Sequence, residues 1–159
     1  MVKSLEQQRS RTTRRMERTR LGNTEKLSIG FTCGAFDLLH AGHIVMLKEA
    51  KQNCDYLIVG LQTDPSIDRQ EKNTPVQSVF ERYVQLRAVK YIDEIIPYDT
   101  EQSLLDLLEA TEIHLRFVGE DYVDRHFTGK GLHEIFYTSR AHSFYSTSLR
   151  NKINESSSK

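Results

Sequence analysis

Short apolar runs alternate with longer amphipathic segments along the chain. Runs of four to six mostly apolar residues predict strands over residues 27–31, 56–61, 94–97, 115–118 and 134–137. Apolar residues spaced three or four apart predict helices over residues 43–51, 79–89, 101–110 and 146–153, with a further short helix over 122–127. Strands that alternate with helices are typical of βαβ units and a parallel sheet. We therefore expect a single α/β domain with a Rossmann-like, three-layer αβα arrangement around a mostly parallel sheet.

Four polar or glycine-containing segments follow predicted strands. They are the run that begins at Gly34, the loop 63–77, the turn at Gly119 and the segment before Ser146. Parallel α/β sheets bind ligands at the carboxyl ends of their strands, near the switch in strand order. Loop 63–77 is also long for a connection in a compact domain, which is typical of functional loops. We expect these four segments to converge on one edge of the sheet and to form a ligand site.

Composition is that of a soluble globular protein. The 159 residues are 38% hydrophobic and 28% charged, which fits one domain. No apolar run approaches the roughly 18 residues that a membrane-spanning helix needs, and the N-terminus lacks the apolar core of a secretory leader. Cys33 and Cys54 do not have metal-ligand spacing, and we expect reduced thiols in a cytoplasmic protein.

Charge is unevenly distributed along a chain whose formal net charge is zero. Residues 1–20 carry seven basic residues and two acidic ones, a net charge of +5. Such a block fits a solvated or helical extension, a contact with nucleic acid or a membrane surface, or an arginine-rich transit peptide. We favour the extension, and nucleic acid is not expected because no aromatic residue interleaves the arginines. The chain thus divides into a basic extension (1–26), a folded domain (27–154) and a flexible tail (155–159).

The most specific motif is the run GAFDLLHAGH over residues 34–43, where the first strand passes into the first helix. Imidazoles can donate hydrogen bonds to phosphate oxygens, and a helix opening near His43 adds free N–H groups and partial positive charge. Gly34 and Gly42 let a phosphate approach the backbone. When one phosphate attacks another, the attacking phosphate is already ionised and needs no general base. The protein must instead neutralise charge and hold the attacking and leaving groups in line. The motif therefore predicts that His40 and His43 act on reacting phosphates.

This run resembles the signature of the nucleotidyltransferase superfamily, in the G-x-F-D-x-x-H-x-G-H form of cytidylyltransferases. From residue 31 to residue 153 the chain is similar to the glycerol-3-phosphate cytidylyltransferase family. The similarity extends to Thr63-Asp64, Arg82, the stretch 91–97 (YIDEIIP), the run 119–122 (GEDY), Arg140 and Ser146-Thr147-Ser148. Two departures leave the nucleotide and the acceptor open. Ala35 replaces a common threonine, and the segment 140–146 is one residue longer than the family motif and lacks its Thr-Glu-Gly.

The resemblance implies a role for each matching residue. The implied catalytic residues are His40, His43, Arg140 and Lys72, a loop lysine that would swing onto the triphosphate. The implied nucleotide-binding residues are Cys33, Gly34, Ala35, Phe36, Asp37, Gly42, Asp64, Arg82, Gly119, Asp121, Ser146, Thr147 and Ser148. Among these, residues 146–148 would open a second helix N-terminus around the β- and γ-phosphates, and Asp121 would recognise the base or ribose. Arg82 would bind the triphosphate or the acceptor, whereas His142 is left as a loop residue or an acceptor contact.

A reaction follows from the same resemblance. The enzyme would transfer CMP from CTP to a phosphorylated small alcohol, with glycerol 3-phosphate as the first choice, and would release pyrophosphate. The product would be a CDP-alcohol such as CDP-glycerol, used for a cell-surface polymer or a lipid. Mg²⁺ is expected on the triphosphate, and no residue is assigned as a metal ligand. A homodimer is also implied.

Two alternatives stay open at this point. One is an ATP-dependent adenylyltransferase acting on FMN or a sugar phosphate, because such enzymes share much of the signature. The other is a nucleotide-binding regulator that keeps the phosphate site without turnover.

Overall fold

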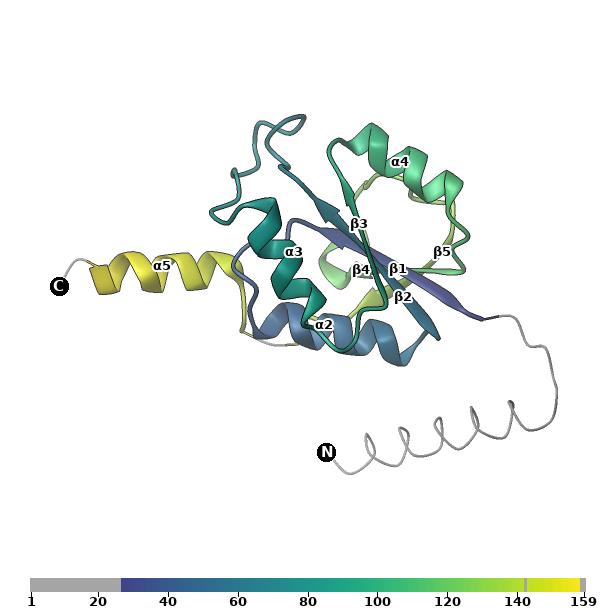
Figure 1. Ribbon diagram of the computed structural model, residues 1–159, viewed down its shortest axis with the longest axis horizontal. Helices are drawn as coiled ribbons and strands as arrows, with labels where there is room; N and C mark the ends of the chain where they lie inside the picture. Colours follow the sequence, from purple (N-terminus) through teal and green to yellow (C-terminus); the bar gives the residue numbers. More distant parts are fainter. Residues whose placement is uncertain (1–26, 142, 158–159) are drawn as a thin grey trace, which may run out of the picture.

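A five-stranded sheet, parallel throughout, forms the centre of the protein (Figure 1). The computed structural model describes residues 27–141 and 143–157, so the predicted extension 1–26 and His142 lie outside the described residues. The strands are β1 (Ile29–Gly34), β2 (Tyr56–Gln62), β3 (Glu94–Tyr98), β4 (Leu115–Gly119) and β5 (Glu134–Thr138). Their order across the sheet is β3-β2-β1-β4-β5. The predicted mostly parallel sheet is confirmed.

Helices cover both faces of this sheet. They are α2 (Ala41–Gln52), α3 (Val79–Arg87), α4 (Glu101–Ala110) and α5 (Ser146–Ser157). On one face, Val59 of β2 belongs to an apolar cluster with Leu47 of α2 and Leu86 of α3. On the other face, the adjacent Ile58 clusters with Leu104 of α4. Because side chains alternate along a strand, this continuously apolar segment is buried on both sides, as predicted for a central parallel strand. The three-layer αβα arrangement is confirmed.

The strand order reverses next to β1. The chain proceeds outward from β1 to β2 and β3, then returns to place β4 on the other side of β1. A crevice forms at such a switch point, because the connections from neighbouring strands leave in opposite directions. The carboxyl ends of β1 and β4 therefore define the edge at which a ligand site is expected.

Three boundaries differ from the sequence-based expectation. The short helix predicted over 122–127 is not formed: a single 3₁₀ turn covers Glu120–Tyr122, and turns with Gly129 and Gly131 at φ 71° and 97° follow. Glycine adopts positive φ without steric cost, which suits the turns that follow residue 127. Helix α5 continues to Ser157, so residues 155–157, predicted as flexible tail, are helical. Helix α2 begins at Ala41 rather than near residue 43, which makes His40 its N-cap.

Helix α5 projects away from the sheet, at the left of Figure 1. Its first turns are held to the domain by a salt bridge of 2.5 Å between Arg150 and Asp37. Within the described part of the chain, no helix is long and apolar enough to cross a membrane. Cytoplasmic location stays a prediction.

Candidate functional site

The turn between β1 and α2 is held in a strained conformation by its own motif residues. Phe36 and Leu38 have φ values of 50° and 51°, which cost energy for residues other than glycine. The Asp37 carboxylate accepts hydrogen bonds of 3.0 Å from the backbone N–H groups of Val76 and Gln77. Burial raises the pKa of Asp37, but these N–H groups and Arg150 outweigh burial and lower it. Phe36 and Asp37 thus position the turn rather than line the site.

Two histidines cap the first helix reciprocally. The Nδ1 atom of His40 accepts from the N–H of Gly42 at 3.1 Å, and the N–H of His40 donates to Nδ1 of His43 at 3.4 Å. The ring centroids are 4.0 Å apart. A neutral imidazole whose Nδ1 accepts a hydrogen bond carries its proton on Nε2. Both histidines therefore present Nε2–H as a donor.

His43 is neutral at physiological pH. Burial, followed by electrostatic interactions with His40 and Arg140, lowers the pKa of His43 to about 4, and Asp37 opposes this shift only in part. A neutral His43 can donate a hydrogen bond from Nε2, and it carries no positive charge near pH 7.

A second helix N-terminus lies beside the first. The Nε2 atom of His40 is 3.0 Å from Oγ of Ser146, the first residue of α5, and the tautomer above makes this serine the acceptor. The opening N–H groups of a helix lack intrahelical partners and carry partial positive charge, so two such ends together favour an anion. The predicted helix start at Ser146 is confirmed, whereas Thr147 and Ser148 do not line the cavity described next.

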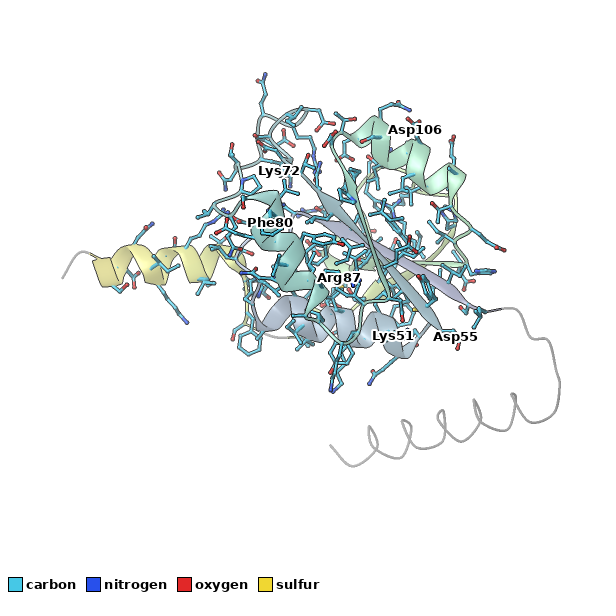
Figure 2. The ribbon with its side chains drawn as sticks, in the orientation of Figure 1. Lys51, Asp55, Lys72, Phe80, Arg87 and Asp106 are labelled. Atoms are coloured by element: carbon cyan, nitrogen blue, oxygen red, sulfur yellow. The ribbon has the colours of Figure 1, made fainter. Side chains whose placement is uncertain are left out.

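A cavity of about 710 Å³ opens at the carboxyl ends of β1 and β4. It lies within the volume range of small-molecule sites. The predicted residues that line it are Cys33, Gly34, Ala35, His40, Gly42, His43, Lys72, Gly119, Asp121, Arg140 and Ser146. The four predicted catalytic residues are thus brought together from three separate segments of the chain: the start of α2, the loop between β2 and α3, and the segment before α5. Lys72 is exposed on the loop between β2 and α3, and Figure 2 labels it above α3.

Arg140 and Asp121 form one wall of the cavity. Their side chains make a salt bridge of 2.7 Å, and the Arg140 guanidinium lies 5.2 Å from the centroid of the Tyr145 ring. A Cβ atom on Gly119 would lie 2.5 Å from Oδ1 of Asp121. Glycine is therefore required at residue 119 if Asp121 is to reach Arg140. An ion pair beside an exposed aromatic ring can bind the ribose and base of a nucleotide through hydrogen bonds and stacking.

Arg82 does not face the cavity, contrary to the expected ligand role. Its side chain is 1% exposed, and its guanidinium donates to four backbone carbonyls. These are the carbonyls of Ala35, Gln62, Thr63 and Gln77. Buried carbonyls need partners, so Arg82 joins the signature turn, the end of β2 and the start of α3.

Asp64 also lies away from the cavity lining. Its Oδ1 atom accepts hydrogen bonds from the N–H and the hydroxyl of Ser66, at 2.9 and 2.6 Å. These bonds lower the pKa of Asp64. The Asp64 side chain closes a local turn, a common role of aspartate in loops.

Sequence reasoning missed a polar group on the α4 side of the cavity. It consists of Gln62, Arg69, Glu101, Arg116 and Thr128. One signal was available: Arg116 interrupts the apolar run LRFVG, and a charge inside a buried strand calls for a specific partner. The other members come from a loop, a helix start and a strand end, whose convergence only the fold reveals.

An all-parallel five-stranded α/β fold with a histidine pair at the helix after its first strand defines a nucleotidyltransferase. The chain belongs to the cytidylyltransferase-like family, whose model matches residues 31–157. The superfamily predicted from residues 34–43 is thereby confirmed.

Comparison with individual proteins also supports the superfamily. Bifunctional protein HldE from Caulobacter sp. (strain K31) is 43% identical over 97 residues, which are 60% of this chain and 20% of that protein. The chain therefore spans only about a fifth of that relative's length.

Solved structures share the fold. A lipopolysaccharide core biosynthesis protein from Thermoplasma volcanium GSS1 gives a TM-score of 0.54 at 23% identity, covering 82% of this chain and 88% of that one. Pantoate-beta-alanine ligase from Francisella tularensis gives a TM-score of 0.54 at 19% identity, covering 86% of this chain and 74% of that one.

Proposed function

We propose that this nucleotidyltransferase joins a nucleoside monophosphate to the phosphate of a phosphorylated polyol or sugar and releases pyrophosphate. The observation that carries the proposal is the Nε2–H donor of His43 at the start of α2, beside the start of α5, whose first residue Ser146 accepts the Nε2–H of His40. Neutral donors and helix N-termini stabilise negative charge that grows on a phosphate, without a proton transfer that this reaction does not need.

In the proposed step, an oxygen of the acceptor phosphate attacks the α-phosphorus of the triphosphate. A new P–O bond forms, the bond from the α-phosphorus to the oxygen that bridges to the β-phosphorus breaks, and that oxygen leaves with pyrophosphate. His43 would donate to an α-phosphate oxygen. Lys72, exposed on its loop, would neutralise the leaving pyrophosphate.

Mg²⁺ is proposed to enter with the triphosphate. Within residues 27–141 and 143–157, no three His, Cys, Asp or Glu side chains come together as a metal site. Mg²⁺ in such sites is commonly held by substrate phosphates, water and one or two carboxylates. When bound, the ion would neutralise charge on the phosphates.

Two donor and acceptor pairs are candidates. CTP with glycerol 3-phosphate is the pair that the sequence resemblance implies. ATP with a sugar phosphate is the second, because such adenylyltransferases share much of the sequence signature, and the relatives that match include bifunctional proteins HldE. The homodimer implied by the resemblance stays a prediction.

Pyrophosphate release tests the proposal directly. CTP and ATP are each supplied with Mg²⁺ and with glycerol 3-phosphate, mannose 1-phosphate or FMN in turn. Release with CTP and glycerol 3-phosphate supports the first pair, and release with ATP and mannose 1-phosphate supports the second. Release only with FMN moves the protein to flavin adenylyl transfer. Nucleotide binding without release from any pair contradicts catalysis with these acceptors and favours the regulator.

A further inference from the structure

Arg116 is a buried cation in the wall of the cavity. It belongs to β4, opposite Phe31 of β1, and so lies on the face of the sheet that α4 covers. Its side chain is 3% exposed. Among the described residues, no carboxylate lies within salt-bridge distance of its guanidinium. The buried arginines differ in this respect: the Arg82 guanidinium is taken up by four carbonyls, whereas Arg116 has fewer partners.

The contacts of Arg116 orient it without neutralising it. One terminal nitrogen donates to the backbone carbonyl of Thr128, and the other lies 4.0 Å from Sγ of Cys33. The guanidinium carbon is 5.1 Å from the centroid of the Phe127 ring. Burial raises the pKa of Cys33, so this thiol is not a counter-ion near neutral pH. A buried charge that the protein does not pair is favourable only when a ligand of opposite charge completes it.

A second set of polar groups surrounds this cation. The Thr128 hydroxyl donates to Glu101, and Glu101 forms a salt bridge of 3.0 Å with Arg69. Arg69 also donates to Oε1 of Gln62 at 2.8 Å. The group carries two positive charges and one negative charge, so its net charge is positive. Carboxylate, amide and guanidinium groups around one space are suited to a ligand that has both an oxyanion and hydroxyl groups.

The two sides of the cavity are chemically different. The side at α2 and α5 presents the histidine donors and two helix N-termini, as described above. The side at α4 presents Arg116 and Glu101, and both sides line one continuous cavity. A transfer between two phosphates needs two separate anion sites that meet at the reacting atoms.

We propose that Arg116 determines acceptor binding, by holding the acceptor's phosphate on the α4 side while Glu101 accepts hydrogen bonds from the acceptor's hydroxyl groups. The inference rests on the proposed function, because it assigns the acceptor to the space that the triphosphate leaves. The planar fork of an arginine can bind two phosphate oxygens at once, which lysine cannot do.

The first test is Arg116→Gln, with Arg87→Gln as the matched control. Arg87 is exposed at the end of α3, outside the cavity lining, and is labelled in Figure 2. With glycerol 3-phosphate or mannose 1-phosphate, R116Q should raise the acceptor KM by roughly 10- to 100-fold and leave the triphosphate KM within about twofold. R87Q should change neither. Unchanged acceptor KM in R116Q, or an equal loss of triphosphate binding, overturns the assignment.

Calorimetric binding of the same two phosphate esters, without nucleotide, separates this inference from the proposed function. Acceptor binding that R116Q weakens supports the inference even if no pyrophosphate is released. Binding that R116Q leaves intact, or no binding of either ester by the wild-type protein, contradicts it.

Further variants cover the case in which R116Q does not fold, as judged by circular dichroism. Arg116→Lys keeps the charge and should raise the acceptor KM by less than R116Q would, roughly three- to tenfold. Glu101→Gln should weaken glycerol 3-phosphate, which has hydroxyl groups, more than propyl phosphate, which has none. Equal effects on the two esters contradict the role of Glu101, and a wild-type acceptor KM in R116K contradicts the role of Arg116.

Discussion

The Nε2 atom of His40 lies 3.0 Å from the Oγ atom of Ser146, although 106 positions separate the two residues. This contact places the start of the last helix against the start of the first. A second link, the 2.5 Å salt bridge between Asp37 and Arg150, holds the same two segments together one turn further along α5. The proposed anion site uses both helix ends, so its formation would depend on docking of α5.

Replacing His43 with asparagine should reduce kcat by roughly 10²- to 10³-fold, the usual effect of removing one donor to a developing oxyanion. The fold should persist, because His43 lies at the edge of the cavity rather than in an apolar cluster. Pyrophosphate release measures the rate, and a thermal melt checks the fold. Wild-type turnover in a folded variant would rule out a catalytic role for His43.

The pKa of His43 has a consequence for stability. Since His43 titrates near 4 in the folded protein and near 6.5 in an unfolded chain, acid protonates the unfolded state first. The contribution of neutral His43 to the free energy of unfolding is therefore present above pH 6.5 and is lost as the pH falls towards 4. The free energy of unfolding should fall by roughly 2 kcal/mol between pH 7 and pH 5 for this reason. Urea unfolding of the wild-type protein and of His43→Asn at both pH values should show this difference.

The same titration can be observed directly by NMR. The imidazole carbon-bound protons of His43, assigned by their loss in His43→Asn, should move with a midpoint near pH 4. A midpoint near 6.5 would mean that His43 is a cation for part of the physiological range, and the neutral-donor mechanism would then be wrong.

Arg82 should be important for stability rather than for ligand binding. Arg82→Met leaves buried carbonyls without their donor and should lower the free energy of unfolding by on the order of 3 kcal/mol. Urea denaturation measures the loss. The triphosphate KM of the folded fraction should stay within about twofold of the wild-type value. A stable variant with a much higher KM would restore the ligand role expected from the sequence.

Lys72→Ala should raise the triphosphate KM or lower kcat by roughly tenfold, because the cation proposed to neutralise the leaving group is lost. Lys90→Ala is the matched control, since Lys90 is an exposed lysine outside the cavity lining. Steady-state kinetics at low ionic strength compare the two. Identical behaviour of the two variants would make Lys72 an ordinary solvated loop residue.

Much of the fold was predictable because its causes are local. The apolar run of β2, buried on both faces, and the alternation of strands with helices indicate a parallel sheet before any contact is known. The helix predicted over 122–127 is replaced by a 3₁₀ turn over Glu120–Tyr122 and by further turns. The weak apolar period of this short segment does not by itself distinguish a helix from such turns.

The site was predictable to the extent that its residues are close in sequence. The run 34–43 determines by itself a strand-to-helix turn with two imidazoles at a helix start, since the capping bonds join residues at most three positions apart. By contrast, the tertiary structure alone decided that Arg82 serves backbone carbonyls and that Arg116 faces the cavity. Their partners come from distant segments, and burial and hydrogen bonding act on the neighbours that folding brings together, not on neighbours in sequence.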